Sequence, residues 1–179
     1  MSLLELLFGE GEGVPETPER PAALELHPQP LSIYAPVTGT TMPMADIPDP
    51  IFASGAMGQA VGIKPRDGVV YAPVSGTVTL ITHTLHAIGL ESDDGLQILI
   101  HLGVDTVKLR GEGFHGFVQQ GQRVEAGEPL VVMDLDRIAE AGYSDVVITA
   151  VSNTDDFASV VVAGSGQVSA GDQVLSAHR

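Results

Sequence analysis

The sequence has no cysteine, and aromatic residues make up only 4% of it. Without cysteine there are no disulfides, no thiolate chemistry and no cysteine-ligated zinc finger. No apolar run approaches the roughly 20 residues of a membrane-spanning helix. The opening MSLLELLFG also lacks the basic start of a signal peptide and is too short for one. We therefore expect a cytoplasmic protein.

Basic residues are scarce as well. Eight Lys and Arg stand against 23 Asp and Glu, which gives a formal net charge of −15 at pH 7. So much negative charge disfavours binding to nucleic acid and to anionic lipid surfaces. It favours encounter with a basic protein partner.

The first 30 residues differ from the rest of the chain. They hold six acidic residues against one arginine, and five of the 12 prolines. Their apolar residues are few apart from a cluster at the start: Leu3, Leu4, Leu6, Leu7 and Phe8. We expect a disordered acidic tail or linker over residues 1 to 30 and one domain over residues 31 to 179.

Two short segments of the domain are each repeated. Ala-Pro-Val-Thr-Gly-Thr at residues 35 to 40 returns as Ala-Pro-Val-Ser-Gly-Thr at residues 72 to 77. Val-Glu-Ala-Gly at residues 124 to 127 returns as Val-Ser-Ala-Gly at residues 168 to 171. With 21 glycines and many β-branched residues, this pattern predicts an all-β, antiparallel sandwich or barrel with internal duplication. We expect helical turns near residues 134 to 141 and 154 to 160, little helix elsewhere, and a loop over residues 44 to 51.

Residues 82 to 107 form a predicted hairpin that carries two histidines. Asp94-Gly95 is a strong turn signal between two apolar strands. A two-residue turn there pairs Ile88 with His101, so that His86 and His101 become diagonal neighbours on one face, roughly 7–8 Å apart. An odd-length turn or a bulge would separate them. The buried face of the second strand should carry Ile98, Ile100 and Leu102.

The paired histidines admit more than one chemistry. A neutral imidazole is a good nucleophile toward phosphorus, and glycine beside it lets an oxyanion approach backbone N–H groups. Two histidines are also half a zinc site, for which Asp105 or a partner's carboxylate would supply a third ligand. The remaining histidines are expected to be buried structural residues: His27, His83, His115 and His178.

The string GLQILIHLGVDTV at residues 95 to 107 resembles the segment around the phosphorylated histidine of glucose-class IIA components of the bacterial sugar phosphotransferase system. Further segments of roughly residues 31 to 177 are similar too: APVTG (35–39), PDPIFA (48–53), GIKP (62–65), APVSGT (72–77), HAI (86–88), GEGF (111–114) and GQRV (121–124).

The resemblance implies a duplicated β-sandwich, the duplicated hybrid motif of that family. It implies that His101 accepts a phosphoryl group from the histidine-containing phosphocarrier protein and passes it to a IIB domain. His86 and Thr84 then complete the catalytic site. In the mechanism that we expect, backbone amides near Gly103 and Asp105 help to hold the phosphoryl group. The implied docking residues are Phe52, Met57, Leu99 and Val107.

We expect that the protein requires no cofactor. A zinc ion bound by His86 and His101 is the alternative. We expect the protein to meet the membrane only through the permease. The alternatives are a regulatory binding module of the same fold that does not transfer phosphate, and a zinc-dependent hydrolase. The sequence does not indicate which sugar is served, nor whether the chain acts alone or within a longer permease.

Overall fold

The computed structural model describes residues 17 to 179, and strands dominate it. Every strand pairing is antiparallel, which confirms the predicted fold class. The strands are β1 (Ser32–Tyr34), β2 (Gly39–Met42), β3 (Gln59–Pro65), β4 (Val69–Tyr71), β5 (Gly76–Ile81), β6 (Ala87–Ser92), β7 (Gln97–Val104), β8 (Phe114–Gly116), β9 (Arg123–Val124), β10 (Pro129–Met133), β11 (Ser144–Val151), β12 (Ser159–Val162), β13 (Gln167–Val168) and β14 (Gln173–His178).

The helical segments are short: η1 (Met44–Asp46), α2 (Pro50–Ala53), η2 (Thr106–Leu109), α3 (Leu135–Glu140) and η3 (Thr154–Asp156). Two of them, α3 and η3, lie where helical turns are predicted. The segment predicted as loop contains η1 and α2 instead. Asp49 caps α2 by accepting the N–H of Ile51, and Pro50 suits the first turn of a helix. Among the described residues, no helix is long and apolar enough to cross a membrane.

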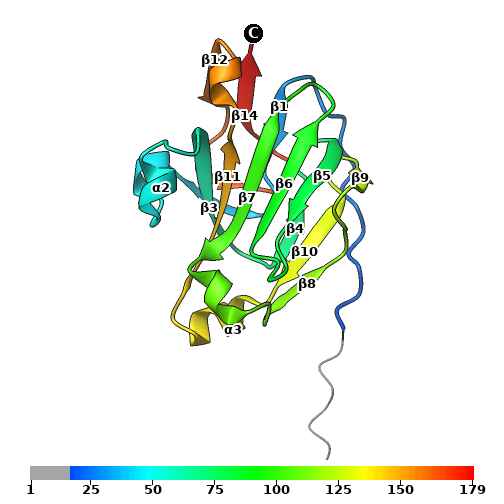
Figure 1. Ribbon diagram of the computed structural model, residues 1–179, viewed down its shortest axis with the longest axis vertical. Helices are drawn as coiled ribbons and strands as arrows, with labels where there is room; N and C mark the ends of the chain where they lie inside the picture. The colour runs from blue at the N-terminus through cyan, green and yellow to red at the C-terminus, as the bar shows by residue number, and fades with distance from the viewer. Residues whose placement is uncertain (1–16) are drawn as a thin grey trace, which may run out of the picture.

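Three sheets make up the sandwich (Figure 1). The large sheet has the strand order β13-β2-β3-β11-β7-β6-β5-β9, and the small sheets have the orders β1-β14-β12 and β4-β10-β8. The main apolar core lies between the large sheet and the small ones and takes residues from all three. Ile98, Ile100 and Leu102 of β7 belong to this core, as predicted, so the residues between them face outward.

The internal duplication is visible in the topology. In the large sheet, β13 and β2 form one edge, and β9 and β5 form the equivalent opposite edge. Each small sheet has three strands, with β14 in the middle of one and β10 in the middle of the other. The repeated segments lie at equivalent places, with Gly39 starting β2 and Gly76 starting β5. An added Cβ would lie 2.0 Å from the carbonyl oxygen of Lys64 at Gly39, and 2.0 Å from that of Glu91 at Gly76. Both copies therefore need glycine for the same close strand approach.

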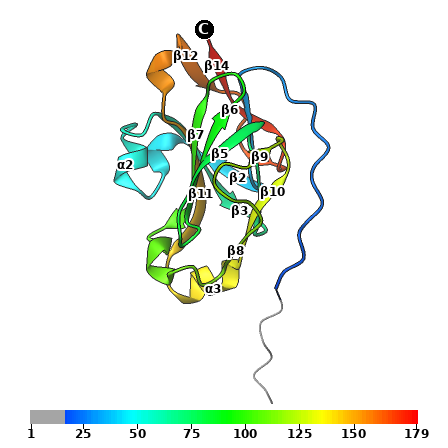
Figure 2. The same ribbon diagram turned by 45° about the vertical axis from the view of Figure 1, so that its right-hand side comes forward.

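A second, smaller apolar cluster lies on the outer face of the large sheet. It joins Phe52 of α2 and Ile47 to outward-facing residues of β3 and β11, among them Ala60 and Ile148. Figure 2 shows α2 on the side of the sheet away from β9 and β10. The segment from η1 to α2 thus covers part of the outer face and leaves the neighbouring part, over β6 and β7, to the histidines.

Residues 17 to 30 have no helix or strand, yet they contact the domain on the side away from α2 (Figure 2). The N–H of Leu24 donates to the carbonyl of Gly127 at 2.9 Å. The side chains of Leu24 and Leu26 pack where a Cβ on Gly127 or Gly171 would stand. We expected a disordered tail over residues 1 to 30, and that expectation did not include these contacts of Leu24 and Leu26 with the domain. The expectation for residues 1 to 16, including the Leu cluster, lies outside the described residues.

Candidate functional site

His101 lies on β7, on the outer face of the large sheet. Its neighbours along the strand, Ile100 and Leu102, are fully buried in the core, whereas His101 is half-buried and reaches solvent. Across the sheet it stands opposite Ala87 of β6 and Ile148 of β11. The alternation of β7 predicted this placement, and the structure confirms it.

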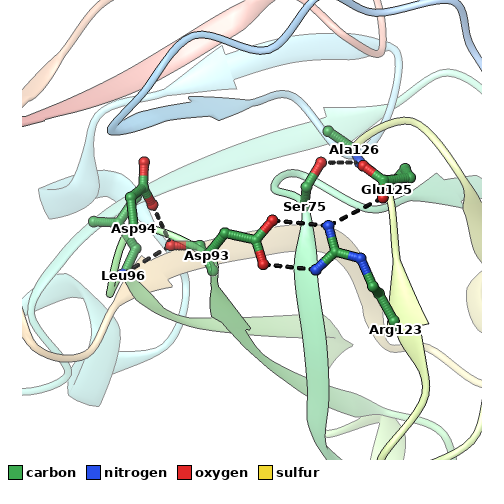
Figure 3. A network of polar contacts seen from close by, with 8 residues as sticks. Ser75, Asp93, Asp94, Leu96, Arg123, Glu125 and Ala126 are labelled. Carbon is green, nitrogen blue, oxygen red and sulfur yellow. Dashed lines mark hydrogen bonds and ion pairs between the residues drawn. The ribbon is translucent and has the colours of Figure 1, made fainter.

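The register of the β6–β7 hairpin differs by one residue from the prediction. Ala87, and not Ile88, stands opposite His101, because the turn holds three residues, 93 to 95, instead of two. Gly95 adopts φ +93°, which suits a turn of this length. Asp93, the first residue of this turn, forms a bidentate ion pair with Arg123, at 2.6 and 2.8 Å (Figure 3). This contact accompanies the three-residue turn.

A three-residue turn alone would direct the His86 side chain to the opposite face from His101. An irregular segment just before β6 turns it back to the same face. Strand β6 begins only at Ala87, and Leu85 has φ +60°, in the left-handed region. The irregular segment is closed by Thr82, whose N–H donates to the carbonyl of Ala87 and whose Oγ1 accepts the N–H of Ala87, both at 3.1 Å. The backbone carbonyl of His86 accepts the N–H of Leu102 at 2.7 Å. Two departures from a regular hairpin therefore cancel, and His86 lies beside His101 as predicted.

The two imidazole rings stand edge to face, with centroids 5.5 Å apart and an interplanar angle of 76°. Nδ1 of His101 lies 2.6 Å from the carbonyl oxygen of Gly103. Because a carbonyl can only accept, Nδ1 carries the proton and Nε2 of the neutral ring has a free lone pair. Nδ1 of His86 lies 2.5 Å from Oγ1 of Thr84 and 3.3 Å from Oγ1 of Thr82. Both rings are therefore held at Nδ1, which leaves each Nε2 available.

The pKa of His86 is lowered from its ordinary value. Burial is the larger cause, since it disfavours the charged imidazolium, and the neighbouring His101 is the smaller one. Both causes favour the neutral form of His86. A neutral ring whose Nδ1 accepts a hydroxyl hydrogen carries its own proton on Nε2, where it is a hydrogen-bond donor.

The predicted docking residues differ in their exposure. Phe52 is only 5% exposed, so it is not part of an exposed rim, and its ring packs 5.5 Å from the ring of His101. Met57 and Leu99 are half-buried, and Val107 is 47% exposed. Ile51 was not predicted, yet it is 58% exposed at the start of α2. Its place after the Asp49-Pro50 helix start, one residue before a buried Phe, could have indicated that it faces solvent.

Gly103 and Asp105 shape the end of β7. Both have positive φ, +83° and +62°. Gly103 directs its carbonyl oxygen at His101, whereas the prediction assigned its N–H to a phosphoryl group. That role for the Gly103 and Asp105 amides stays a prediction. Thr106 is fully buried, and its Oγ1 donates to the carbonyl of Leu102 at 2.5 Å.

The other histidines are not core residues. His27, His83 and His178 are exposed, and His115 is half-buried with its ring against Phe117, so the expectation that they are buried was wrong. The described part of the chain holds no group of three or more His, Cys, Asp or Glu that could bind a metal ion. The zinc alternative would therefore need a ligand beyond His86 and His101.

Known proteins resemble the chain in sequence. Residues 31 to 157 match the family described as phosphoenolpyruvate-dependent sugar phosphotransferase system, EIIA 1. The PTS system glucose-specific EIIA component of Staphylococcus aureus (strain COL) is 38% identical over 170 residues, which are 95% of each chain. The N-acetylglucosamine-specific EIICBA component of Klebsiella pneumoniae is 42% identical over 144 residues.

The lengths of these relatives differ. The chain spans only about a fifth of two EIICBA relatives, 22% of the Klebsiella pneumoniae protein and 19% of a glucose-specific one from Staphylococcus saprophyticus. A solved structure, glucose permease IIA from Mycoplasma capricolum, superposes with a TM-score of 0.73 at 32% identity, over 85% of this chain and 98% of that one. A domain like this one therefore occurs both alone and joined to further components.

Proposed function

The chain belongs to the EIIA 1 family of the phosphoenolpyruvate-dependent sugar phosphotransferase system, and on this premise we propose that His101 carries the phosphoryl group in transit. It is a phosphotransferase component of the glucose-specific IIA type. The observation that carries the proposal is the contact between His101 Nδ1 and the Gly103 carbonyl. It fixes the tautomer in which Nε2, directed away from the backbone, is the nucleophile.

In the proposed step the lone pair of His101 Nε2 attacks phosphorus in line. The new P–N bond forms as the P–N bond to the donor histidine breaks, and the electron pair of that bond returns to the donor ring. His101 keeps its Nδ1 proton throughout, because the Gly103 carbonyl holds it. Little covalent work falls to the protein, so that positioning and charge stabilisation supply most of the catalysis.

His86 is proposed to stabilise the transferred group. If Thr84 donates to Nδ1 of His86, the Nε2–H of His86 can donate to a phosphoryl oxygen, and the ring contact at 5.5 Å keeps His86 beside a group carried on Nε2 of His101. A phosphoryl group on His101 would in turn raise the pKa of His86, because the negative charge favours imidazolium. The half-buried apolar residues Met57 and Leu99 lie on the same face as His101. With a partner docked over them, they would exclude water from the phosphohistidine.

The proposed donor is the histidine-containing phosphocarrier protein, and the proposed acceptor is a IIB domain, in the cytoplasm. The fused IIC, IIB and IIA components of relatives support the acceptor, since fusion keeps the two domains at high effective concentration. The net charge of −15 favours a basic donor surface. Relatives bear names for glucose, N-acetylglucosamine and β-glucoside. The sugar is thus proposed to be set by the permease that this domain serves.

Reconstitution tests the proposal. The protein is incubated with phosphoenolpyruvate, the first enzyme of the system and the phosphocarrier protein, and its intact mass is measured before and after a IIB domain is added. We expect one phosphoryl group to be gained and then lost to the IIB domain. No gain under conditions that phosphorylate the phosphocarrier protein would favour the regulatory module that does not transfer phosphate.

A further inference from the structure

Thr106 is a buried polar residue next to the site, and the mechanism above gives it no role. It is fully buried at the start of η2, four residues beyond Leu102. Its hydroxyl donates to the carbonyl oxygen of Leu102 at 2.5 Å. Since a hydroxyl without a partner is costly to bury, this bond fixes the direction of both groups.

The Leu102 backbone links the two histidines. Its N–H donates to the carbonyl of His86 at 2.7 Å, and its own carbonyl is the one that Thr106 holds. The peptide that begins with this carbonyl ends at the N–H of Gly103. Thr106 therefore anchors the peptide that joins the His86 backbone contact to the residue whose carbonyl binds His101 Nδ1.

Gly103 is fitted to the Thr106 side chain. At φ +83° an added Cβ would lie 2.4 Å from Cγ2 of Thr106 and 2.7 Å from the carbonyl oxygen of Ser144. The Thr106 methyl group thus occupies the space beside the Gly103 Cα and limits rotation about its N–Cα bond. That rotation would swing the Gly103 carbonyl away from His101.

We propose that Thr106 is a positioning residue for phosphoryl transfer, which holds the Gly103 carbonyl against His101 Nδ1 and so keeps the Nε2 of His101 free to react. The hydroxyl fixes the Leu102–Gly103 peptide, and the methyl group fixes the Gly103 conformation. Thr106 acts through Gly103 and does not touch the phosphoryl group. The inference rests on the proposed function for its effect on rate, but not for its effect on the His101 tautomer.

Two substitutions separate the hydroxyl from the shape of the side chain. Thr106→Val keeps the shape and removes the donor, and Thr106→Ser keeps the donor. Thr149→Val is the matched control, because Thr149 is equally buried and its Oγ1 has no hydrogen-bond partner among the described residues. Thr149 lies on β11, opposite Ile100 of β7. Ile100 precedes His101 in the sequence and faces the core.

The first readout is the ¹⁵N chemical shifts of the His101 ring in the unphosphorylated full chain. We expect a protonated Nδ1 in wild type, Thr106→Ser and Thr149→Val, and a growing share of the tautomer with a protonated Nε2 in Thr106→Val. The second readout is the rate of phosphoryl transfer, which we expect to fall roughly two- to ten-fold in Thr106→Val, as for the loss of one ordinary hydrogen bond. Thr106→Ser keeps the hydroxyl but lacks the methyl group, so its rate should lie between the rates of wild type and Thr106→Val.

A Thr106→Val protein with the wild-type tautomer and the wild-type rate would overturn the inference, and so would a Thr106→Ser protein as impaired as Thr106→Val. Should Thr106→Val fail to fold, the wild-type protein still decides. Its Thr106 hydroxyl proton should exchange slowly with water, and a rapidly exchanging one would contradict the proposed anchor. If the wild type accepted no phosphoryl group while the tautomer shift appeared, the proposed function would fail and the positioning role would stand.

Discussion

At the scale of single residues, the site consists of two imidazoles that the backbone and two threonines orient. Their ring environments differ, since His101 is held by a carbonyl and His86 by hydroxyls. In the proposed function, this difference favours His101 as the nucleophile and His86 as the hydrogen-bond donor. Both histidines lie on one face, as expected from the sequence, although the regular two-residue hairpin behind that expectation does not form. Their hydrogen-bond partners were predictable only for Thr84, because the Gly103 contact depends on a left-handed backbone that a pattern of residue types does not reveal.

The lowered pKa of His86 yields a prediction at this scale. In wild type, His86 should titrate below the usual value of 6.5. His101→Gln removes the smaller cause and leaves burial, so the pKa of His86 should rise slightly and stay below 6.5. Because the folded state binds this proton less readily than the unfolded state, stability should fall as the pH drops below 6.5 toward the lowered pKa. ¹H–¹⁵N titration of the imidazoles in both proteins measures the values, and a His86 pKa above 6.5 in wild type would contradict this account.

At the scale of elements, the duplicated halves and the strand alternation could be predicted from the sequence, whereas the hairpin register could not. Asp94-Gly95 is a strong signal for a two-residue turn. The same dipeptide also suits a three-residue turn that ends with Gly95 in the left-handed region, and this turn is the one that forms. The residue types alone do not decide between the two turn lengths. Likewise, the contacts of Leu24 and Leu26 are invisible to composition, which indicated only an acidic, Pro-rich segment.

The close strand approach at the start of each half gives a second prediction. Gly76→Ala should lower the free energy of unfolding by about 3 kcal/mol, at the upper end for overpacking, because the new Cβ would meet a backbone carbonyl that cannot move aside. Gly121→Ala is the control: it has φ +88° but open space around it, so only backbone strain of about 1 kcal/mol is expected. Urea titration measures both. A Gly76→Ala loss no larger than that of Gly121→Ala would show that the strands tolerate separation.

The segment before the domain gives a third prediction. Removing residues 1 to 30 should lower the melting temperature by several degrees, since two half-buried leucines worth about 1–3 kcal/mol together lose their contacts with the domain. Leu26→Asp in the full chain should reproduce most of the loss, because it places a charge between Gly127 and Gly171. Calorimetry of the three proteins tests this. Equal melting temperatures would mean that the segment is a dispensable tail.

At the scale of the whole molecule, the two halves of the sandwich share one topology but differ in the residues on the outer face of the large sheet. The histidine pair lies where they differ. Strands β11 and β7 occupy equivalent positions at the centre of the large sheet, but only β7 carries an outward histidine, where β11 carries Ile148. The segment from η1 to α2 covers the outer face beside that centre, leaving the histidines at the margin of the small apolar cluster. The outer face of this phosphotransferase-family domain therefore carries a pair of adjacent imidazoles, the pair to which we assign phosphoryl transfer.

The central claim is that His101 carries the phosphoryl group and His86 assists. Wild type, His101→Gln and His86→Gln are each phosphorylated through the phosphocarrier protein, and the site is mapped by mass spectrometry of peptides. The account predicts phosphate on His101 in wild type, and no retained phosphate in His101→Gln. It predicts transfer slowed roughly ten- to a hundred-fold in His86→Gln, the cost of one charge-assisted hydrogen bond of about 1.5–3 kcal/mol, with phosphate still on His101. Phosphate on His86, His83 or His115, or any on the His101→Gln protein, would contradict it.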